Sequence, residues 1–207
     1  MTRGVHVYFG GTFDPPHRGH HEMLRALLDD PWIDQIHLVP TGRNPLKATE
    51  FLGDRERRKA WLKLWLQEFP GEKRIVVETL EIDREDSGPQ YTIETLRELQ
   101  ARDSRQAWVL CVGGDIPKDF HRWKDVERLF ANLHSVWVFP RGTQADPLAD
   151  MDPKLRSLTE FRIMGVSVPE ISSTQIREAS RNNASQGTWD AFLLPSIKEN
   201  LTDLARS

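Results

Sequence analysis

Residues 9–20, FGGTFDPPHRGH, join a short apolar run, Val5 to Phe9, to a segment in which apolar residues recur at helical spacing between positions 23 and 28. A glycine pair between a strand and a helix is typical of the place where open α/β sheets bind ligands. This stretch therefore predicts both the first β-α unit of the fold and the position of a site.

The residue types within this stretch suit an anionic ligand. Gly10 and Gly11 carry no side chain, so a ligand can approach the backbone closely. We expect Asp14 to cap the following helix, with Pro15 at its first position. The exposed N–H groups of that first turn would then form an anion site.

Further apolar runs alternate with segments of helical spacing along the rest of the chain. The predicted strands cover residues 35–40, 74–79, 108–112 and 135–139, with a weaker last strand at 165–168. The predicted helices follow Asp54, begin at Tyr91, and cover residues 124–131, 172–180 and 197–204. The order indicates an α/β fold: a Rossmann-like, doubly wound, mainly parallel sheet with helices on both faces. We expect one domain over residues 1–207, with the polar segment 141–161 as a surface excursion.

Composition excludes several classes of protein. The 28 Lys and Arg residues against 31 Asp and Glu residues give a net charge of −3, which argues against a nucleic-acid partner. The sequence has no apolar run long enough for a membrane span. Cys111 is the only cysteine and the first residues lack a signal-peptide pattern, so we expect a reducing cytoplasm. A homo-oligomer is compatible with all of these features.

Two histidines in the opening stretch are candidate phosphate ligands. His17 and His20 are three residues apart, so on a helix they project from the same face near its positive end. A zinc site is a weaker alternative, because His17 and His21 have helical ligand spacing but lack the glutamate of the H-E-x-x-H motif. The stretch is also neither G-x-G-x-x-G nor a Walker loop. A polyphosphate ligand therefore fits this pair best.

A second constellation is ISSTQIR, residues 171–177. Ser172 and Gln175 form a capping-box pattern, which by itself indicates only a helix start. Arg177, however, places a cation early in that helix, where the macrodipole favours an anion. An anionic ligand at this end would resolve the mismatch.

Two further groups follow later strands. In CVGGD, residues 111–115, the glycines Gly113 and Gly114 permit close backbone approach, and Asp115 could accept hydrogen bonds from a ribose. Cys111 itself fits a buried strand residue. PQYT, residues 89–92, and Trp123 form the last candidate group, whereas the basic run 55–59 is most simply a solvated helix face.

Taken in order, these motifs resemble the bacterial nicotinate-nucleotide adenylyltransferase family, within the nucleotidyltransferases that carry the H-x-G-H motif. The resemblance covers nearly the whole chain and implies transfer of AMP from ATP to nicotinate mononucleotide, with Mg²⁺ bound mainly through the ATP phosphates. His17, His20 and Arg177 would be catalytic. The resemblance implies ATP-binding roles for Gly10, Gly11, Thr12, Phe13, His17, His20, Gly113, Asp115, Ser173, Thr174 and Arg177, and mononucleotide-binding roles for Asn44, Lys47, Tyr91, Thr92 and Trp123.

Two departures from the family pattern concern substrate recognition. Leu46 stands where the family usually has a histidine, and Lys124 stands where an aromatic residue is common. The motifs leave open an enzyme that prefers nicotinamide mononucleotide and a non-catalytic nucleotide sensor. Transfer to 4′-phosphopantetheine is disfavoured, because those enzymes are typically shorter and lack the PQYT motif.

Overall fold

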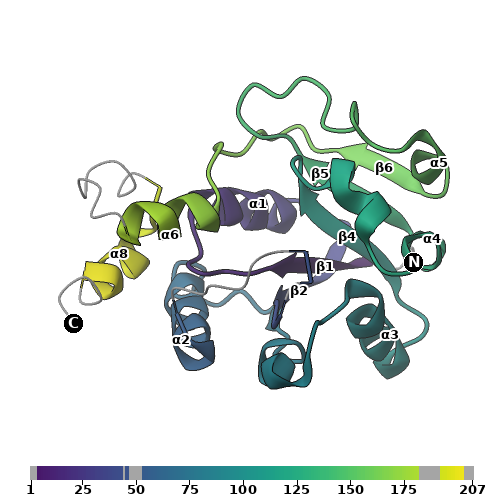
Figure 1. Ribbon diagram of the computed structural model, residues 1–207. Helices are drawn as coiled ribbons and strands as arrows, with labels where there is room; N and C mark the ends of the chain where they lie inside the picture. The colour runs from purple at the N-terminus through teal and green to yellow at the C-terminus, as the bar shows by residue number, and fades with distance from the viewer. Residues whose placement is uncertain (1–3, 44, 47–52, 182–191, 203–207) are drawn as a thin grey trace.

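The structure is a computed structural model that describes residues 4–43, 45–46, 53–181 and 192–202 (Figure 1). Its core is a six-stranded, all-parallel sheet in the order β3-β2-β1-β4-β5-β6. The strands are β1 (Val5–Gly11), β2 (Ile33–Pro40), β3 (Ile75–Val77), β4 (Ala107–Gly113), β5 (Ser135–Phe139) and β6 (Glu160–Ile163). The strand order reverses between β1 and β4, so a crevice opens where the carboxyl ends of these two strands meet. The predicted Rossmann-like fold is confirmed.

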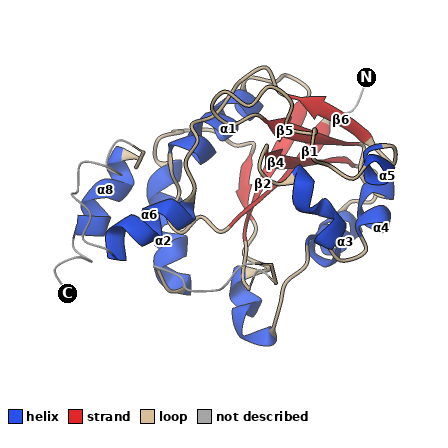
Figure 2. Cartoon of the chain, turned by 45° about the horizontal axis from the view of Figure 1, so that its top comes forward, coloured by secondary structure: helices blue, strands red, loops and turns tan. Residues whose placement is uncertain are grey.

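Helices cover both faces of the sheet, as Figure 2 shows. The core on one face includes side chains of α1 (Arg18–Leu28), α2 (Arg55–Leu66), α6 (Ser173–Arg181) and α8 (Pro195–Thr202), and the core on the other includes side chains of α3 (Thr92–Arg102), α4 (Val126–Ala131) and α5 (Pro153–Arg156). Successive side chains of a strand point to opposite faces of the sheet, so they pack in two separate cores. On β1, Val7 and Phe9 lie in the first core, with α1, and Tyr8 lies in the second core, with α3. The short 3₁₀ helices η1 (Ile82–Ser87) and η2 (Pro117–Arg122) follow β3 and β4.

The last strand differs from the prediction. It is residues 160–163 rather than 165–168, and Val168 makes only an isolated bridge with Arg141. Because β6 is an edge strand with mostly exposed side chains, it lacks the continuous apolar pattern of the central strands. The segment 141–161 is also not a simple surface excursion, since Leu148 and Met151 are buried in the second core.

The start of α1 differs as well. The helix begins at Arg18 with His17 as its N-cap, so Asp14 is not the cap. The Asp14–Pro15 peptide bond is cis, and the fully buried Asp14 carboxylate accepts a hydrogen bond from the Gly53 amide at 2.9 Å. The Asp14 carboxylate therefore binds an amide that is distant in the sequence, rather than capping the helix that follows it.

The helix α2 confirms one expectation and corrects another. Asp54 caps it, as predicted, by accepting from the Arg57 amide at 2.9 Å. In the basic run, Arg58 is fully buried rather than solvated: its guanidinium donates to the carbonyls of Thr12 and Thr41. This arginine therefore ties together the loops that follow β1 and β2. Among the described residues, no helix has the length and apolar character to cross a membrane.

Candidate active site

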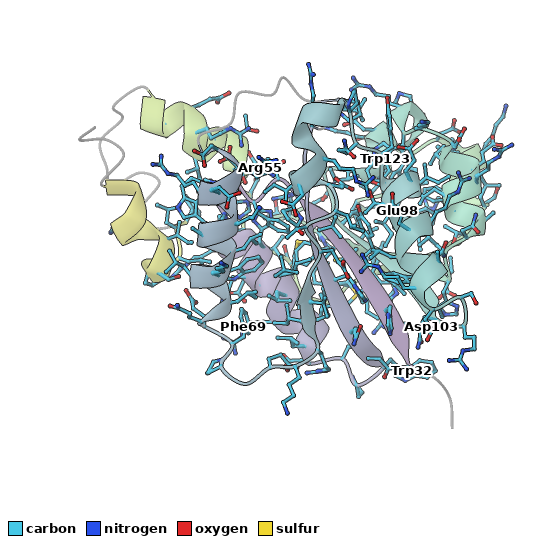
Figure 3. All side chains as sticks on the ribbon, turned by 90° about the horizontal axis from the view of Figure 1, so that it is seen from below. Trp32, Arg55, Phe69, Glu98, Asp103 and Trp123 are labelled. Atoms are coloured by element: carbon cyan, nitrogen blue, oxygen red, sulfur yellow. The ribbon has the colours of Figure 1, made fainter. Side chains whose placement is uncertain are left out.

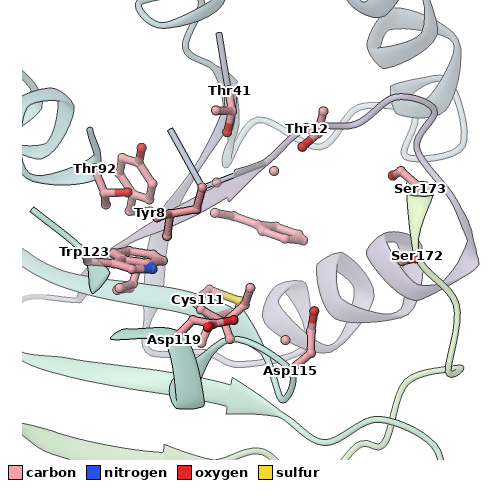
Figure 4. Close-up of a pocket in the computed structure, with 18 of the residues that line it drawn as sticks. Tyr8, Thr12, Thr41, Thr92, Cys111, Asp115, Asp119, Trp123, Ser172 and Ser173 are labelled. Carbon is pink, nitrogen blue, oxygen red and sulfur yellow. The ribbon is translucent and has the colours of Figure 1, made fainter. Parts of the chain in front are cut away.

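A cavity of about 240 Å³ opens at the carboxyl ends of β1, β2 and β4. Figure 3 shows Trp123 and Arg55 at this end of the strands, and Trp32 and Asp103 at the opposite end. The side chains that Figure 4 labels fall into two groups. Thr12, Asp115 and Ser173 lie on one side, while Tyr8, Thr92 and Trp123 lie on the other. The cavity therefore has one end rich in backbone and hydroxyl groups and another that is aromatic.

The two histidines of the opening stretch lie at the first end. Their rings stack with centroids 3.7 Å apart and planes 23° apart. The His17 amide donates to Nδ1 of His20 at 3.3 Å, and His17 is almost completely buried. Phe13 packs edge-on against the His20 ring at 4.9 Å, from the core side. The N-terminus of α1 therefore presents a rigid pair of imidazoles to the cavity.

The N-terminus of α6 is fixed against the same loop. The Arg177 guanidinium donates to the Asp14 carbonyl at 3.2 Å and lies 3.7 Å from the Asp14 carboxylate. The Ser173 hydroxyl donates to the Pro15 carbonyl at 3.1 Å. The Ser172–Gln175 capping box is confirmed, with bonds of 2.8 and 3.2 Å between the two residues. Two helix N-termini thus converge on one cavity, which is a strong arrangement for binding phosphates.

Asp115 lies at the end of β4, as predicted, but it has a partner that the sequence analysis missed. Nε of Arg141 donates to its carboxylate at 2.5 Å, and another nitrogen of this guanidinium donates to the Ile171 carbonyl at 2.6 Å. Arg141 also lines the cavity. Its position just after the apolar run 135–139 was the available signal, because the carboxyl ends of parallel strands share one edge.

The aromatic end is built from the start of α3 and the end of η2. Tyr91 is the N-cap of α3, and Trp123 packs edge-on against the buried Phe120 at 5.0 Å. Nζ of Lys124 lies 4.3 Å above the centre of the Tyr91 ring and donates to the Glu94 carboxylate at 2.6 Å. This cation–π contact fixes a positive charge at the rim.

The four Lys and Arg side chains that line the described part of the cavity each pair with a carboxylate. Arg177 is near Asp14 and Arg141 near Asp115, while Arg122 pairs with Asp119 and Lys124 with Glu94. These carboxylates hold the cations in fixed positions before any ligand binds. Preorganised charges of this kind stabilise developing negative charge without a reorganisation cost.

Most of the predicted site residues meet in this cavity. Those that line it are Gly10, Gly11, Thr12, His17, His20, Gly113, Asp115, Ser173, Thr174, Arg177, Tyr91, Thr92 and Trp123. Phe13 does not: its side chain is fully buried behind His20, which gives it a supporting position. Asn44 and Lys47 lie outside the described residues, whereas Leu46 lines the cavity. Tyr8 and Glu81 also line the cavity, and like Arg141 they belong to none of the motifs seen in the sequence.

Cys111 lies on β4 and its thiol is buried, as expected. Burial raises its pKa far above the ordinary range for a thiol, so it stays protonated. Among the residues the structure describes, no cluster of three or more His, Cys, Asp or Glu side chains could hold a metal ion. His21, the second residue of the zinc alternative, instead accepts from Nε1 of Trp65 at 3.4 Å and lies 3.5 Å from Glu68.

Comparison with known proteins gives consistent matches. A family model described as Cytidylyltransferase-like matches residues 8–179. A probable nicotinate-nucleotide adenylyltransferase from Leptospira interrogans is 35% identical over 83% of this chain and 82% of its own length. Another from Geobacillus thermodenitrificans is 32% identical over 90% of this chain and 78% of its own.

Solved structures share the fold. The Plasmodium falciparum nicotinic acid mononucleotide adenylyltransferase complexed with NaAD superposes with a TM-score of 0.71 over 98% of both chains, at 19% identity. The same enzyme complexed with APC gives a TM-score of 0.69. At this identity the likeness supports the fold alone.

Proposed function

Because this chain belongs to the Cytidylyltransferase-like family, and its curated relatives are named nicotinate-nucleotide adenylyltransferases, we infer that it transfers AMP from ATP to nicotinate mononucleotide. The products are nicotinate adenine dinucleotide and pyrophosphate, so the chain is a nucleotidyltransferase of NAD biosynthesis. One observation carries this function: a single cavity joins an end with two helix N-termini and stacked imidazoles to an aromatic end that can hold a flat pyridine ring.

We assign the ATP phosphates to the end formed by the starts of α1 and α6. Both substrates are polyanions, so their approach is opposed by charge repulsion and needs fixed groups that are positive or donate hydrogen bonds. Two helix N-termini, the His17–His20 pair and Arg177 supply such groups here. Asp115, held by Arg141, is proposed to accept hydrogen bonds from the adenosine ribose.

The reaction that fits this site is direct displacement. A phosphate oxygen of the mononucleotide forms a bond to the α-phosphorus of ATP, the bond from that phosphorus to the bridging oxygen breaks, and pyrophosphate leaves. Two candidate nucleophiles among the described lining residues are not activated: the Ser173 hydroxyl donates to a backbone carbonyl, and burial keeps the Cys111 thiol protonated. Catalysis then consists of positioning and electrostatic stabilisation of the transition state.

Mg²⁺ is proposed to enter with ATP, bound mainly by the phosphates and water, a mode this cation commonly uses. The phosphate end of the cavity fits that mode, because the starts of α1 and α6 would hold the ATP phosphates that carry the ion. When bound, the ion would neutralise part of the phosphate charge.

The decisive experiment is pyrophosphate release from ATP and Mg²⁺ with either nicotinate mononucleotide or nicotinamide mononucleotide at matched concentrations. A strong preference for the acid is expected. A preference for the amide would support adenylyl transfer but show that nicotinamide mononucleotide is the acceptor. ATP binding without release from either acceptor would refute the transferase and favour a nucleotide sensor.

A further inference from the structure

An arginine behind the cavity, Arg58 of α2, holds two of the loops that line it. Its side chain is fully buried and is not itself part of the cavity lining. Nε and one terminal nitrogen donate to the Thr12 carbonyl at 3.1 and 2.9 Å, and the same terminal nitrogen donates to the Thr41 carbonyl. Thr12 follows β1, Thr41 follows β2, and both line the cavity (Figure 4). One side chain therefore fixes the two loops relative to each other.

The bond to Thr12 acts on a strained part of the backbone. A peptide group is planar, so holding the Thr12 carbonyl also fixes the orientation of the Phe13 amide in the same group. Phe13 has a φ of 47°, a left-handed conformation that is costly for a bulky residue and persists where the surrounding structure enforces it. Arg58 supplies such a constraint at the peptide group immediately before Phe13. The shape of the loop that follows β1 therefore depends on this guanidinium.

Residues 41–43 extend the connection to the aromatic end. The Thr41 amide donates to the Gly11 carbonyl at 2.9 Å, at the phosphate end. Two residues later, the Arg43 carbonyl accepts from the Gln90 amide at 2.8 Å. Gln90 lies just before α3, whose start forms the aromatic end. The segment 41–43 is thus hydrogen-bonded to both ends of the cavity, and Arg58 holds its first carbonyl.

Gly42, in the middle of this segment, is packed too closely to carry a side chain. A Cβ added there would collide with the Glu81 carbonyl oxygen and come within 3.1 Å of Cγ of Gln90. Closely packed groups transmit a displacement instead of absorbing it. A shift at the Arg58 end of the segment is therefore passed on to Gln90.

We propose that Arg58 is a positioning residue for the transfer step, which aligns the two ends of the cavity through residues 41–43. This inference rests on the proposed function, which assigns one substrate to each end. Each end keeps contacts of its own, through Arg177 at the phosphate end and Lys124 at the aromatic end. Loss of the Arg58 contacts therefore leaves both substrates bound but changes their relative placement, to which in-line displacement is highly sensitive.

The first test compares Arg58→Lys with Leu62→Ala by steady-state kinetics, at a temperature well below both thermal midpoints. Arg58→Lys keeps the charge but replaces the planar fork with a compact ammonium group, which cannot hold both carbonyls. Its kcat is expected to fall about tenfold to 100-fold, with KM for ATP and for nicotinate mononucleotide each within about threefold of the wild type. Leu62 is buried in the first core on the same helix and does not line the cavity. Leu62→Ala lowers stability but removes no bond to either carbonyl, so its kcat should match the wild type.

The second test leaves Arg58 in place and displaces the segment. Gly42→Ala must shift residues 41–43 away from the Glu81 carbonyl and should show the same loss of kcat at similar KM values. Gly165→Ala is the matched control, because an added Cβ there meets nothing within 4 Å. Its kinetics should equal those of the wild type.

The proposal is wrong if either Arg58→Lys or Gly42→Ala keeps a wild-type kcat, if the loss appears in KM alone, or if Leu62→Ala loses as much kcat. Should Arg58→Lys fail to fold, Gly42→Ala carries the same test. A wild type that releases no pyrophosphate with nicotinate mononucleotide refutes the proposed function instead. Hydrogen exchange of the Gln90 amide, which needs no substrate, then decides the inference. Gly42→Ala and Arg58→Lys should each exchange this amide at least about tenfold faster than Leu62→Ala does, and equal rates overturn the inference.

Discussion

Nδ1 of His20 accepts the backbone N–H of His17, the residue against whose ring it stacks. A neutral imidazole carries one proton, so acceptance at Nδ1 places that proton on Nε2. One side chain thus does two things: it caps α1 and retains a second nitrogen that can donate. This relationship separates the structural role of His20 from its proposed catalytic role.

The first prediction uses that separation. His20→Ala is expected to lower kcat by about 100-fold, as the loss of one preorganised donor does. His20→Asn retains an acceptor for the His17 amide but loses the Nε2 donor, so it should show the same loss of kcat with a thermal midpoint near the wild type. Steady-state kinetics and thermal unfolding measure the two effects. A His20→Asn enzyme with wild-type kcat would remove this residue from the mechanism.

Arg58 should contribute to stability far more than its neighbour. Arg58→Met removes the buried guanidinium that donates to the Thr12 and Thr41 carbonyls and is expected to cost about 2–3 kcal/mol of unfolding free energy. Arg57→Met, at an exposed position of the same helix, should change it by less than about 0.5 kcal/mol. Urea unfolding measures both. Equal effects of the two substitutions would contradict the role given to Arg58.

Lys124 should favour the acid substrate over the amide. Its ammonium group is fixed above the Tyr91 ring at the aromatic end, where it can attract the extra negative charge of the acid. Lys124→Met is expected to lower kcat/KM for nicotinate mononucleotide about threefold to tenfold and to leave the amide unaffected. Lys63→Met, on the exposed face of α2, is the charge-matched control. An unchanged acid-to-amide ratio in Lys124→Met would exclude this contribution.

Stability should fall on mild acidification because of a partly buried histidine pair, His6 on β1 and His37 on β2. Burial and the neighbouring His37 lower the pKa of His6, which faces Asp34 and Asp103 as well. The folded state therefore disfavours protonated His6, while the unfolded chain takes up the proton at its ordinary pKa. The stability that neutral His6 contributes is therefore fully present above a pH of about 6.5. It is lost as the pH falls through the lowered pKa that His6 has in the folded state.

The measurement is the thermal midpoint at pH 7 and pH 5 for wild type and His6→Asn. Between pH 7 and pH 5, the thermal midpoint of the wild type should fall further than that of the variant. His21, whose pKa is also lowered by burial, titrates in both proteins and cancels in the comparison. An identical loss in both proteins would show that His6 does not cause the pH dependence.

Much of the site was predictable because its groups are local. The glycine pair, the imidazoles at helical spacing and the capping box each lie within one short stretch, and a parallel sheet brings the carboxyl ends of its strands to one edge. By contrast, β6 was predicted in the wrong place because an exposed edge strand carries no strong apolar pattern. Asp14 and Arg58 were misassigned because each looks locally like an ordinary cap or surface charge.

By itself, therefore, the sequence determined the parallel α/β order, the loop that follows β1 and the residue types available to bind phosphates. Only the tertiary structure decided which polar groups are paired: Arg177 with Asp14 and Arg141 with Asp115 as ion pairs, and Tyr8 with Glu81 by a hydrogen bond. The partners in each pair are between 26 and 163 positions apart. The physical reason is that periodicity and capping act over a few residues, whereas burying a charge requires a partner that only the folded chain brings within reach.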